Sequence, residues 1–440
     1  MESRKRMGKK KKKGKAKHEK KILSDFRQQH QNSSGLLNSS SLMSSLTPFY
    51  NGENFELSQL LRRLDKKDAT TRAKNLDRLC EIANTCKPKD AREMLSHWMY
   101  VLDKLWMDND RRVRTNAFKI MLTLTKRVPK ALRKRSKAFL TPWLCSMFDP
   151  CRDVSKLAER SFHLLHEDSV DLMTFLKQED EETIGWILED LEKYLRSSKS
   201  DLSDLKLVSV HEAEIRFSRV LMTSFRTLRR VMSVMFTTGA SNIVVSKLKW
   251  KVWSCLKSGS KYDSAVTRAA HSTFQLILSK GKESVISKWF ESDMSRLKRY
   301  TDLVVASSLF AEKSRENHTI MCNSMLMFLK QFPSCWSSVS YETVLLPRVW
   351  SFLRHGCYGS DLYDSMFVFR SMVPKSIEDK DEFVMNWFES FWEGIPDNVN
   401  TSRFESALST LCRCVQVSFS RMLKSSSSSS EPSSSTSSLL

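Results

Sequence analysis

A self-similar period of about 41 residues is the feature that most constrains how this chain folds. Residues 108–124, DNDRRVRTNAFKIMLTL, align with residues 149–165, DPCRDVSKLAERSFHLL, at an offset of 41 with five identities. Upstream, DATTRAKNLDRL at 68–79 repeats the pattern at an offset of 42, and DSAVTRAAHSTFQLIL at 263–278 repeats it further along. The apolar matches fall at helical spacing, so each copy predicts an amphipathic helix.

A repeat of this length with two helices is typical of HEAT and armadillo arrays. Apolar first helices precede the copies, as in MLSHWMYVLDKLWM and AFLTPWLCSMF. The composition agrees, because the 440 residues include only 11 Gly and 10 Pro, the residues that most often interrupt helices. We predict an all-α, HEAT/armadillo-like α-solenoid, without β-sheet over residues 55–422. The alternative is a set of unrelated amphipathic helices whose spacing agrees by chance.

The repeat assigns structural roles to a small set of residues. An aspartate before each second helix accepts hydrogen bonds from the free N–H groups of the first turn. Apolar residues form the inward stripe, in which alanine lets the neighbouring helix approach. An arginine reaches the acid of the adjacent repeat, which predicts an ion-pair ladder along the array. The repeat-structural residues are Asp68, Arg72, Asp110, Val113, Arg114, Ala117 and Val154.

The two ends of the chain have a composition that does not support a packed core. Residues 1–21 carry ten Lys and two Arg against two Glu, and a serine-rich segment without apolar period follows. The polar stretch RSSKSDLSD at 196–204 is the expected break in the helical part. The expected divisions are a disordered basic and serine-rich tail at 1–50, helical repeats at 51–196, continuing repeats at 205–422 and a disordered serine-rich tail at 423–440.

The formal net charge of +22 favours nucleic acid or an acidic membrane face as a partner. No apolar run approaches the roughly 18 residues that a bilayer span needs, and no apolar segment follows the N-terminal charges as in a secretory signal. We therefore expect an intracellular, soluble protein. We also expect it to be a monomer in the cytosol and to have no membrane partner. The ten cysteines and nine histidines lack the ligand spacing of a zinc site, and no catalytic constellation stands out.

The candidate functional feature is the basic segment KRVPKALRKRSK, residues 126–137, at a turn where Pro129 ends a helix. Such a cluster can contact several phosphates and gain affinity by releasing counterions. The competing interpretation is a solvated loop. The candidate RNA-contacting residues are Lys126, Arg127, Lys130, Arg133, Lys134, Arg135 and Lys137. Trp98, Trp106 and Trp143 could stack on bases, but their helical spacing beside Leu and Met predicts core positions.

Residues 55–165 resemble the N-terminal domain of listerin, a family of ribosome-associated E3 ubiquitin ligases. That family has a helix of the type L-x-K-L-x-K-K-D-x-x-T-K, then a tryptophan-containing helix and D-x-D-R-R-V-R. PWLCSMFDPCRDVSKLAERSF also resembles the family's next unit. The matching positions are Leu61, Leu64, Lys66, Lys67, Asp68, Thr71, Arg72, Trp98, Asp108, Asp110, Arg111, Arg112, Val113 and Arg114.

The resemblance implies the ribosome-docking part of a ligase of ribosome-associated quality control. It implies three partners: the large (60S) ribosomal subunit with a stalled nascent chain, its ribosomal RNA, and a tRNA-binding quality-control protein. In that family the E2 contact belongs to a zinc-binding RING, whose ligand pattern this sequence lacks. We therefore expect a fragment or a divergent relative, with no zinc or other cofactor and no ligase activity by itself. The alternative is a non-enzymatic HEAT-repeat scaffold in ribosome assembly or nuclear transport, with the lysine run as a nuclear address.

Overall fold

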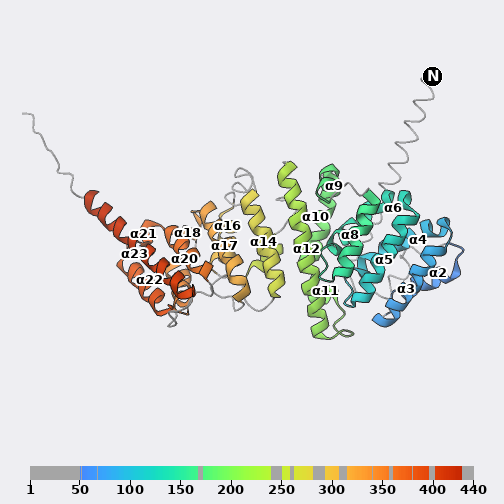
Figure 1. Cartoon of the computed structure of the whole chain (residues 1–440), viewed down its shortest axis with the longest axis horizontal. Helices are drawn as coiled ribbons and strands as arrows, with labels where there is room; N and C mark the ends of the chain where they lie inside the picture. The colour runs from blue at the N-terminus through green and yellow to red at the C-terminus, as the bar shows by residue number, and fades with distance from the viewer. Residues whose placement is uncertain are drawn as a thin grey trace, which may run out of the picture. The chain divides into compact units, whose positions relative to one another are not determined.

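The computed structural model describes residues 50, 52–66, 68–166, 172–238, 250–257, 262–280, 293–306, 315–338, 340–355, 360–378, 380–395 and 402–428. Every regular element in these ranges is a helix, and none of their residues is in a strand. Figure 1 shows helix after helix in chain order. The predicted all-α, HEAT/armadillo-like fold is thereby confirmed.

The chain forms two compact units, with the border between Val252 and Trp253. The first unit contains α2 (Phe55–Arg63), α3 (Ala69–Thr85), α4 (Pro88–Leu105), α5 (Arg111–Arg127), α6 (Pro129–Arg135), η2 (Ser136–Ala138), α7 (Leu140–Ser146), α8 (Arg152–His166), α9 (Leu172–Gln178), α10 (Glu181–Arg196), α11 (Lys199–Leu202) and α12 (Val210–Thr238). The short helix η3 (Trp250–Leu256) spans the border.

The second unit contains α14 (Ser264–Lys280), α16 (Met294–Thr301), η4 (Asp302–Ala306), α17 (Arg315–Gln331), α18 (Cys335–Ser338), η6 (Tyr341–Leu345), α19 (Leu346–Arg354), α20 (Ser360–Ser371), α21 (Lys375–Glu378), α22 (Asp381–Glu393) and α23 (Ser402–Ser428). Helix α14 packs on α17, α17 on α20, and α20 on α23, while α19 packs on α22. This unit is therefore also built from helices that stack on equivalent neighbours.

The predicted boundaries differ from these divisions in two places. The expected break at 196–204 lies inside the first unit, where Ser198 and Asp201 form a capping box on α11. Helix α23 continues to Ser428, past the expected helical end at 422, because serine lowers helix propensity far less than Gly or Pro does. The rest of the two predicted tails lies outside the described residues.

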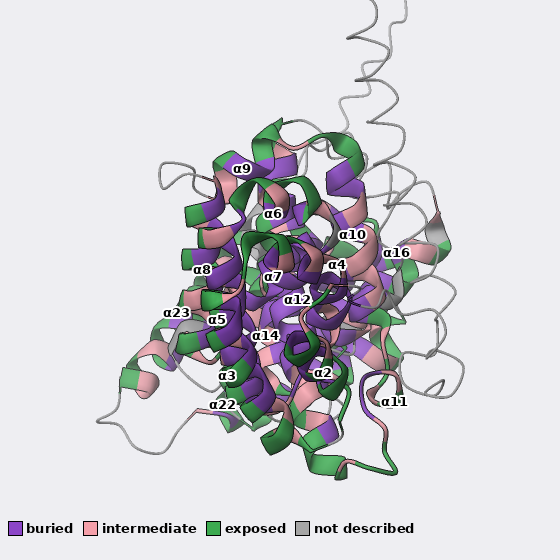
Figure 2. Cartoon of the chain, turned by 90° about the vertical axis from the view of Figure 1, so that its right-hand side faces the viewer, coloured by how far each residue is buried: buried purple, intermediate pink, exposed green. Residues whose placement is uncertain are grey.

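Helices α3, α5 and α8 are the second helices of consecutive repeats, and they pack side by side. Figure 2 shows their exposed residues along one outer edge and their buried residues turned toward the other helices. Val113, Ala117 and Val154 are 0% exposed, as the inward stripe requires. The three tryptophans predicted as core, Trp98, Trp106 and Trp143, are 0–1% exposed, so that prediction is confirmed.

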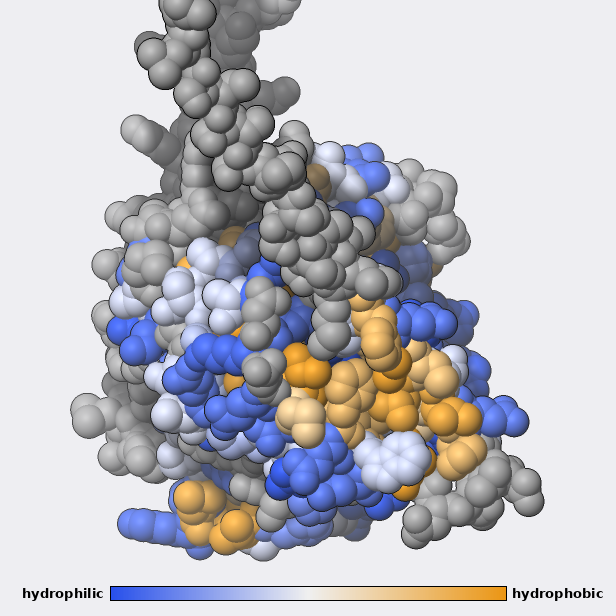
Figure 3. All heavy atoms as spheres, turned by 90° about the vertical axis from the view of Figure 1, so that its left-hand side faces the viewer, coloured by the Kyte–Doolittle hydropathy of each residue, from blue (hydrophilic) through white to orange (hydrophobic). Residues whose placement is uncertain are grey.

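The surface of the second unit is in part apolar. Figure 3 shows hydrophobic side chains gathered on the face that points left in Figure 1. The large apolar side chains exposed on α22 and α23 are Met385, Trp392, Leu408 and Phe419. Among the described helices, none combines the length and the apolar character that crossing a membrane requires.

Candidate nucleic-acid interface

The turns before α3 and α5 are closed by aspartate caps. Asp68 accepts hydrogen bonds from the N–H groups of Thr70 (3.3 Å) and Thr71 (2.6 Å), and the Thr71 hydroxyl holds the pKa of this carboxyl below its usual value. Asp110 accepts from the N–H of Arg112 at 2.8 Å. The Arg112 side chain lies 2.7 Å from the same carboxylate and lowers its pKa. Both aspartates therefore stay ionised at the positive end of a helix.

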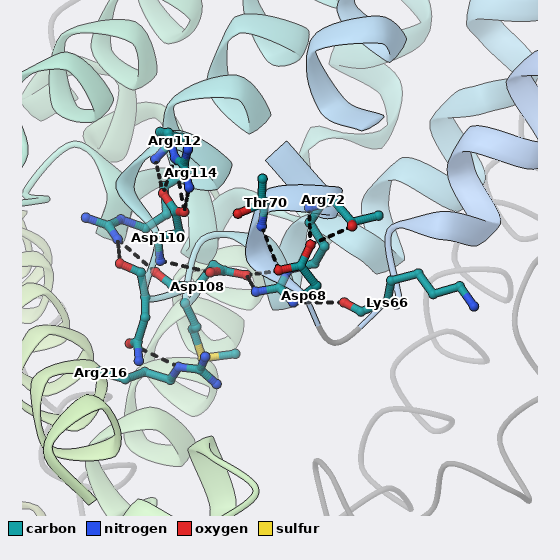
Figure 4. Close-up of polar contacts among 12 residues, drawn as sticks. Lys66, Asp68, Thr70, Arg72, Asp108, Asp110, Arg112, Arg114 and Arg216 are labelled. Atoms are coloured by element: carbon teal, nitrogen blue, oxygen red, sulfur yellow. Dashed lines mark hydrogen bonds and ion pairs between the residues drawn. The ribbon is translucent and has the colours of Figure 1, made fainter. Parts of the chain in front are cut away.

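A second pair of aspartates joins consecutive repeats. Arg72 donates from Nε to Asp108 at 2.9 Å, and Arg114 donates from Nε to Asp149 at 2.8 Å. We call these two ion pairs the turn ladder; Figure 4 shows the part around Asp108. Each acid also accepts a backbone N–H two residues on, from Asp110 at 2.9 Å and from Cys151 at 2.8 Å. The ladder that the repeat spacing predicts is thus present in the structure.

The repeat alignment does not predict the role of one arginine of this network, Arg219. At the position equivalent to Arg114, α8 has Ser155, and the next arginine comes from α12 instead. Arg219 donates to the carbonyl oxygens of Trp106 (3.0 Å), Met107 (2.7 Å) and Asp108 (2.9 Å). Its guanidinium also lies 3.7 Å from the Asp149 carboxylate. Burial, reinforced by the nearby charge of Arg114, lowers the pKa of Arg219.

The basic segment 126–137 does not act as a solvated loop, because four of its seven cations hold the fold together. The Arg127 guanidinium donates to the carbonyls of Asn84 and Cys86 where α3 ends. Arg133 donates to the carbonyl of Leu165 at the end of α8. Arg135 donates to Ser96 Oγ at 2.8 Å. These contacts fasten the end of α5 to the end of α3, and α6 to α8 and α4.

Lys137 fastens the segment to α10. Its ammonium lies 3.1 Å from the Asp180 carboxylate and 3.5 Å from that of Glu179, and it donates to Thr183 Oγ1 at 2.7 Å. Asp180 in turn caps α10 through the N–H of Thr183 at 2.7 Å. Thr183 and then Lys137 lower the pKa of Asp180 to about 2.

The other three cations of the segment are available to bind a ligand. Lys126, Lys130 and Lys134 are exposed, and within the described ranges their ammonium groups have no ion pair or hydrogen bond. Lys130 and Lys134 are one turn apart on α6, and Lys126 belongs to the last turn of α5. Sequence reasoning named all seven cations, but only the stacked structure separates these three from the four that bind carbonyls, a hydroxyl and carboxylates.

The described residues also include no group of three or more His, Cys, Asp or Glu side chains that could hold a metal ion. His163 and His166 lie three residues apart near the end of α8. Burial, with the charge of Arg133, lowers the pKa of His166 to about 4, and its ring packs on Phe162 with centroids 4.6 Å apart. Its neutral imidazole is therefore part of an aromatic cluster.

Comparison with known proteins gives the family. Residues 51–373 match the model described as E3 ubiquitin-protein ligase listerin, N-terminal domain, which extends the resemblance well past residue 165. The E3 ubiquitin-protein ligase listerin of Gallus gallus is 25% identical over 380 residues, covering 81% of this chain and 20% of that protein. The Mus musculus protein of the same name is 24% identical over 379 residues, covering 83% of this chain and 20% of that protein.

Among solved structures, the designed armadillo repeat protein YIII(Dq)4CqI is similar at 16% identity and a TM-score of 0.23, over 61% of this chain and 98% of that one. The chain spans about a fifth of the length of the two curated relatives. Because the family model covers well over half of the 440 residues, the chain belongs to the listerin family of E3 ubiquitin-protein ligases, through its N-terminal domain.

Proposed function

We propose that this chain is the ribosome-docking N-terminal part of a listerin-type ligase of ribosome-associated quality control. It binds large (60S) subunits that still hold a stalled nascent chain, so that the nascent chain is ubiquitinated for degradation. The observation that carries the proposal is the set of three exposed lysines, Lys126, Lys130 and Lys134, on a segment whose other cations are fastened to the fold. Family membership supports the choice of partner.

The chemistry of these lysines suits ribosomal RNA. An ammonium group is a strongly hydrated point charge that pairs with phosphate and displaces condensed counterions. The backbone that carries the lysines is held by Arg127 at the end of α3, by Arg133 at the end of α8 and by Lys137 at the start of α10. A fixed set of charges can match a fixed arrangement of phosphates, which a mobile polycation cannot do.

The proposal includes the partners and the location that this role requires. The protein acts in the cytosol, next to a tRNA-binding quality-control protein on the same subunit. Ubiquitin transfer, the E2 contact and the zinc ions of a RING belong to the catalytic part of the ligase, so we expect this chain alone to be inactive in ubiquitin transfer. The described residues contribute a docking surface.

Sedimentation of the tagged chain with purified subunits through sucrose gradients tests the proposal. Replacing Lys126, Lys130 and Lys134 by Gln should weaken binding to large subunits about tenfold and lower the log–log salt slope by about two to three. The matched control replaces Lys66, Lys87 and Lys206, three exposed lysines of the same unit, and should bind like the unchanged chain. Equal binding by both variants would refute the docking role of the basic segment.

The same gradients separate this role from the scaffold alternative. A docked chain should prefer free large subunits to whole ribosomes, because a site at the subunit interface is covered in the latter. Deleting residues 1–21 should weaken binding without changing this preference. A polycation is attracted to any phosphate backbone and does not distinguish a free subunit from a whole ribosome. Equal binding to naked RNA and to subunits, with both lost together on that deletion, would favour a generic scaffold.

A further inference from the structure

Helix α5 has an unusual charge composition along its whole length. It carries six basic residues and no acidic one, and the sequence contains no Asp or Glu from residue 111 to residue 148. Residues at spacings of four, four, three and four lie on one face of a helix. That face of α5 consists of Arg111, Thr115, Lys119, Leu122 and Lys126. Its three cations are exposed, whereas Thr115 and Leu122 are half-buried, so the outermost groups of the face are the charges.

Helix α8 repeats this face at the offset of 41. The equivalent residues are Arg152, Lys156, Arg160 and His163, and the first three are exposed. The two helices pack side by side, and the turn ladder fixes their register. Arg111 therefore corresponds to Arg152, and Lys119 to Arg160, on neighbouring helices. We call this double row the α5–α8 face.

The positive charge of the α5–α8 face is not neutralised by its surroundings. Over the described ranges, the side chains of its six Lys and Arg residues have no ion pair and no hydrogen bond. The row of cations does not continue onto α3, because the offset of 42 places Asp77, an exposed acid, at the position equivalent to Lys119. Two acids, Asp153 and Glu159, flank the α8 row, and Glu159 lies 3.9 Å from His163. A net positive surface remains over α5 and α8.

The side chains of the α5–α8 face favour base-paired RNA over single-stranded RNA as the anionic ligand. Single-stranded RNA is held by stacking on exposed aromatic rings, but Phe118 of α5 and Phe162 of α8 are both 0% exposed. Paired RNA is recognised through its phosphates, its 2′-hydroxyls and its shape, for which a row of cations suffices. The α8 cations recur every four residues, about 6 Å along the helix, and the next row lies roughly 8–10 Å away.

We propose that the α5–α8 face is a second binding surface, for the sugar–phosphate backbone of base-paired RNA. This second proposal rests on the proposed function only because both surfaces would bind RNA phosphates. The three α8 cations lie outside the basic segment 126–137, so the two surfaces can be changed separately. Lys126 belongs to both and joins them along α5.

Fluorescence anisotropy of the full chain with an RNA duplex of about 16 base pairs and with one of its separated strands tests this proposal. Replacing Arg152, Lys156 and Arg160 by Gln should weaken duplex binding about tenfold and lower its salt slope by about two to three units. The control with Gln at 66, 87 and 206 should bind like the unchanged chain. Equal loss in both variants, or equal affinity of the unchanged chain for duplex and single strand, would overturn the proposal.

Running the subunit sedimentation in parallel distinguishes the two proposals. If the α8 variant loses duplex binding while the Lys126, Lys130 and Lys134 variant still binds subunits normally, the α5–α8 face is supported and docking through the basic segment is wrong. If the α8 variant keeps duplex binding while the lysine variant loses subunit binding, docking stands and the α5–α8 face is refuted. Unchanged circular dichroism of both variants shows that folding is not the cause.

Discussion

Arg219 shows how much a single buried charge can organise. It donates to the three carbonyls that follow α4 and approaches Asp149. Its removal leaves the buried carbonyls of Trp106 and Met107 without this donor, whereas Asp108 and Asp149 keep Arg114. We expect Arg219→Met to lower the free energy of unfolding by about 3–5 kcal/mol. The matched control is Arg226→Met at an exposed position of the same helix, which should change stability by less than about 0.5 kcal/mol. Denaturant titration gives both values, and similar losses would contradict the capping role.

His271 makes the second unit sensitive to acid. Burial lowers the pKa of this histidine to about 4 from a usual 6.5, and its Nδ1 lies 2.9 Å from Ser324 Oγ. Between pH 6.5 and 4 the unfolded chain therefore binds a proton that the folded unit does not, so stability falls as the pH falls through this range. The loss is about 2 kcal/mol at pH 5 relative to pH 7.

Melting curves of the unchanged chain and of His271→Gln at pH 7 and pH 5 measure this effect. The variant should lose less stability on acidification than the unchanged chain, whatever its stability at pH 7. An identical pH dependence would show that His271 does not titrate in this way.

At the scale of helices, the last turn of α5 contains two neighbouring cations that look alike in sequence and differ in their contacts. Arg127 satisfies carbonyls at the end of α3, whereas Lys126 is exposed. Arg127→Gln should cost about 1 kcal/mol of stability, because two carbonyls at the end of α3 lose their donor, and Lys126→Gln should cost almost none. Thermal melting of the two single variants compares neighbouring residues of the same helix. Equal stability of the two would place Arg127 among the ligand-binding cations instead.

The helices also show what the sequence could predict and what it could not. The caps at Asp68 and Asp110, the buried stripe through Val113 and the ladder arginines all follow from the repeat, because a fixed period repeats the same local chemistry. The partners of Arg133, Lys137 and Arg219 do not follow from it. Those partners are 32 to more than 100 residues away and are brought close only by the stacking of helices, which no local pattern contains.

At the scale of the whole molecule, two compact units should unfold in separate steps. Val113 is 0% exposed in the first unit, and Val113→Asp would bury an unpaired charge at a cost of several kcal/mol. Calorimetry should show the transition of the first unit at a lower temperature and that of the second unit unchanged. A single transition that shifts as a whole would mean that the units unfold together, and an unshifted one that this helix face is not core.

In evolutionary terms, the turn ladder allows a repeat to be gained or lost only on the N-terminal side of the array. The joint between α3 and α5 and the joint between α5 and α8 use the same Arg–Asp contact at nearly the same spacing. Gain of one such repeat unit on the N-terminal side of Trp106 would therefore keep the ladder and leave the contacts of Arg219 in place. Beyond α8, Ser155 replaces the arginine, and the network is closed from α12. A duplication inserted anywhere between Asp108 and Arg219 would separate Arg219 from the carbonyls that it binds, so we expect changes in repeat number to fall on the N-terminal side of Trp106.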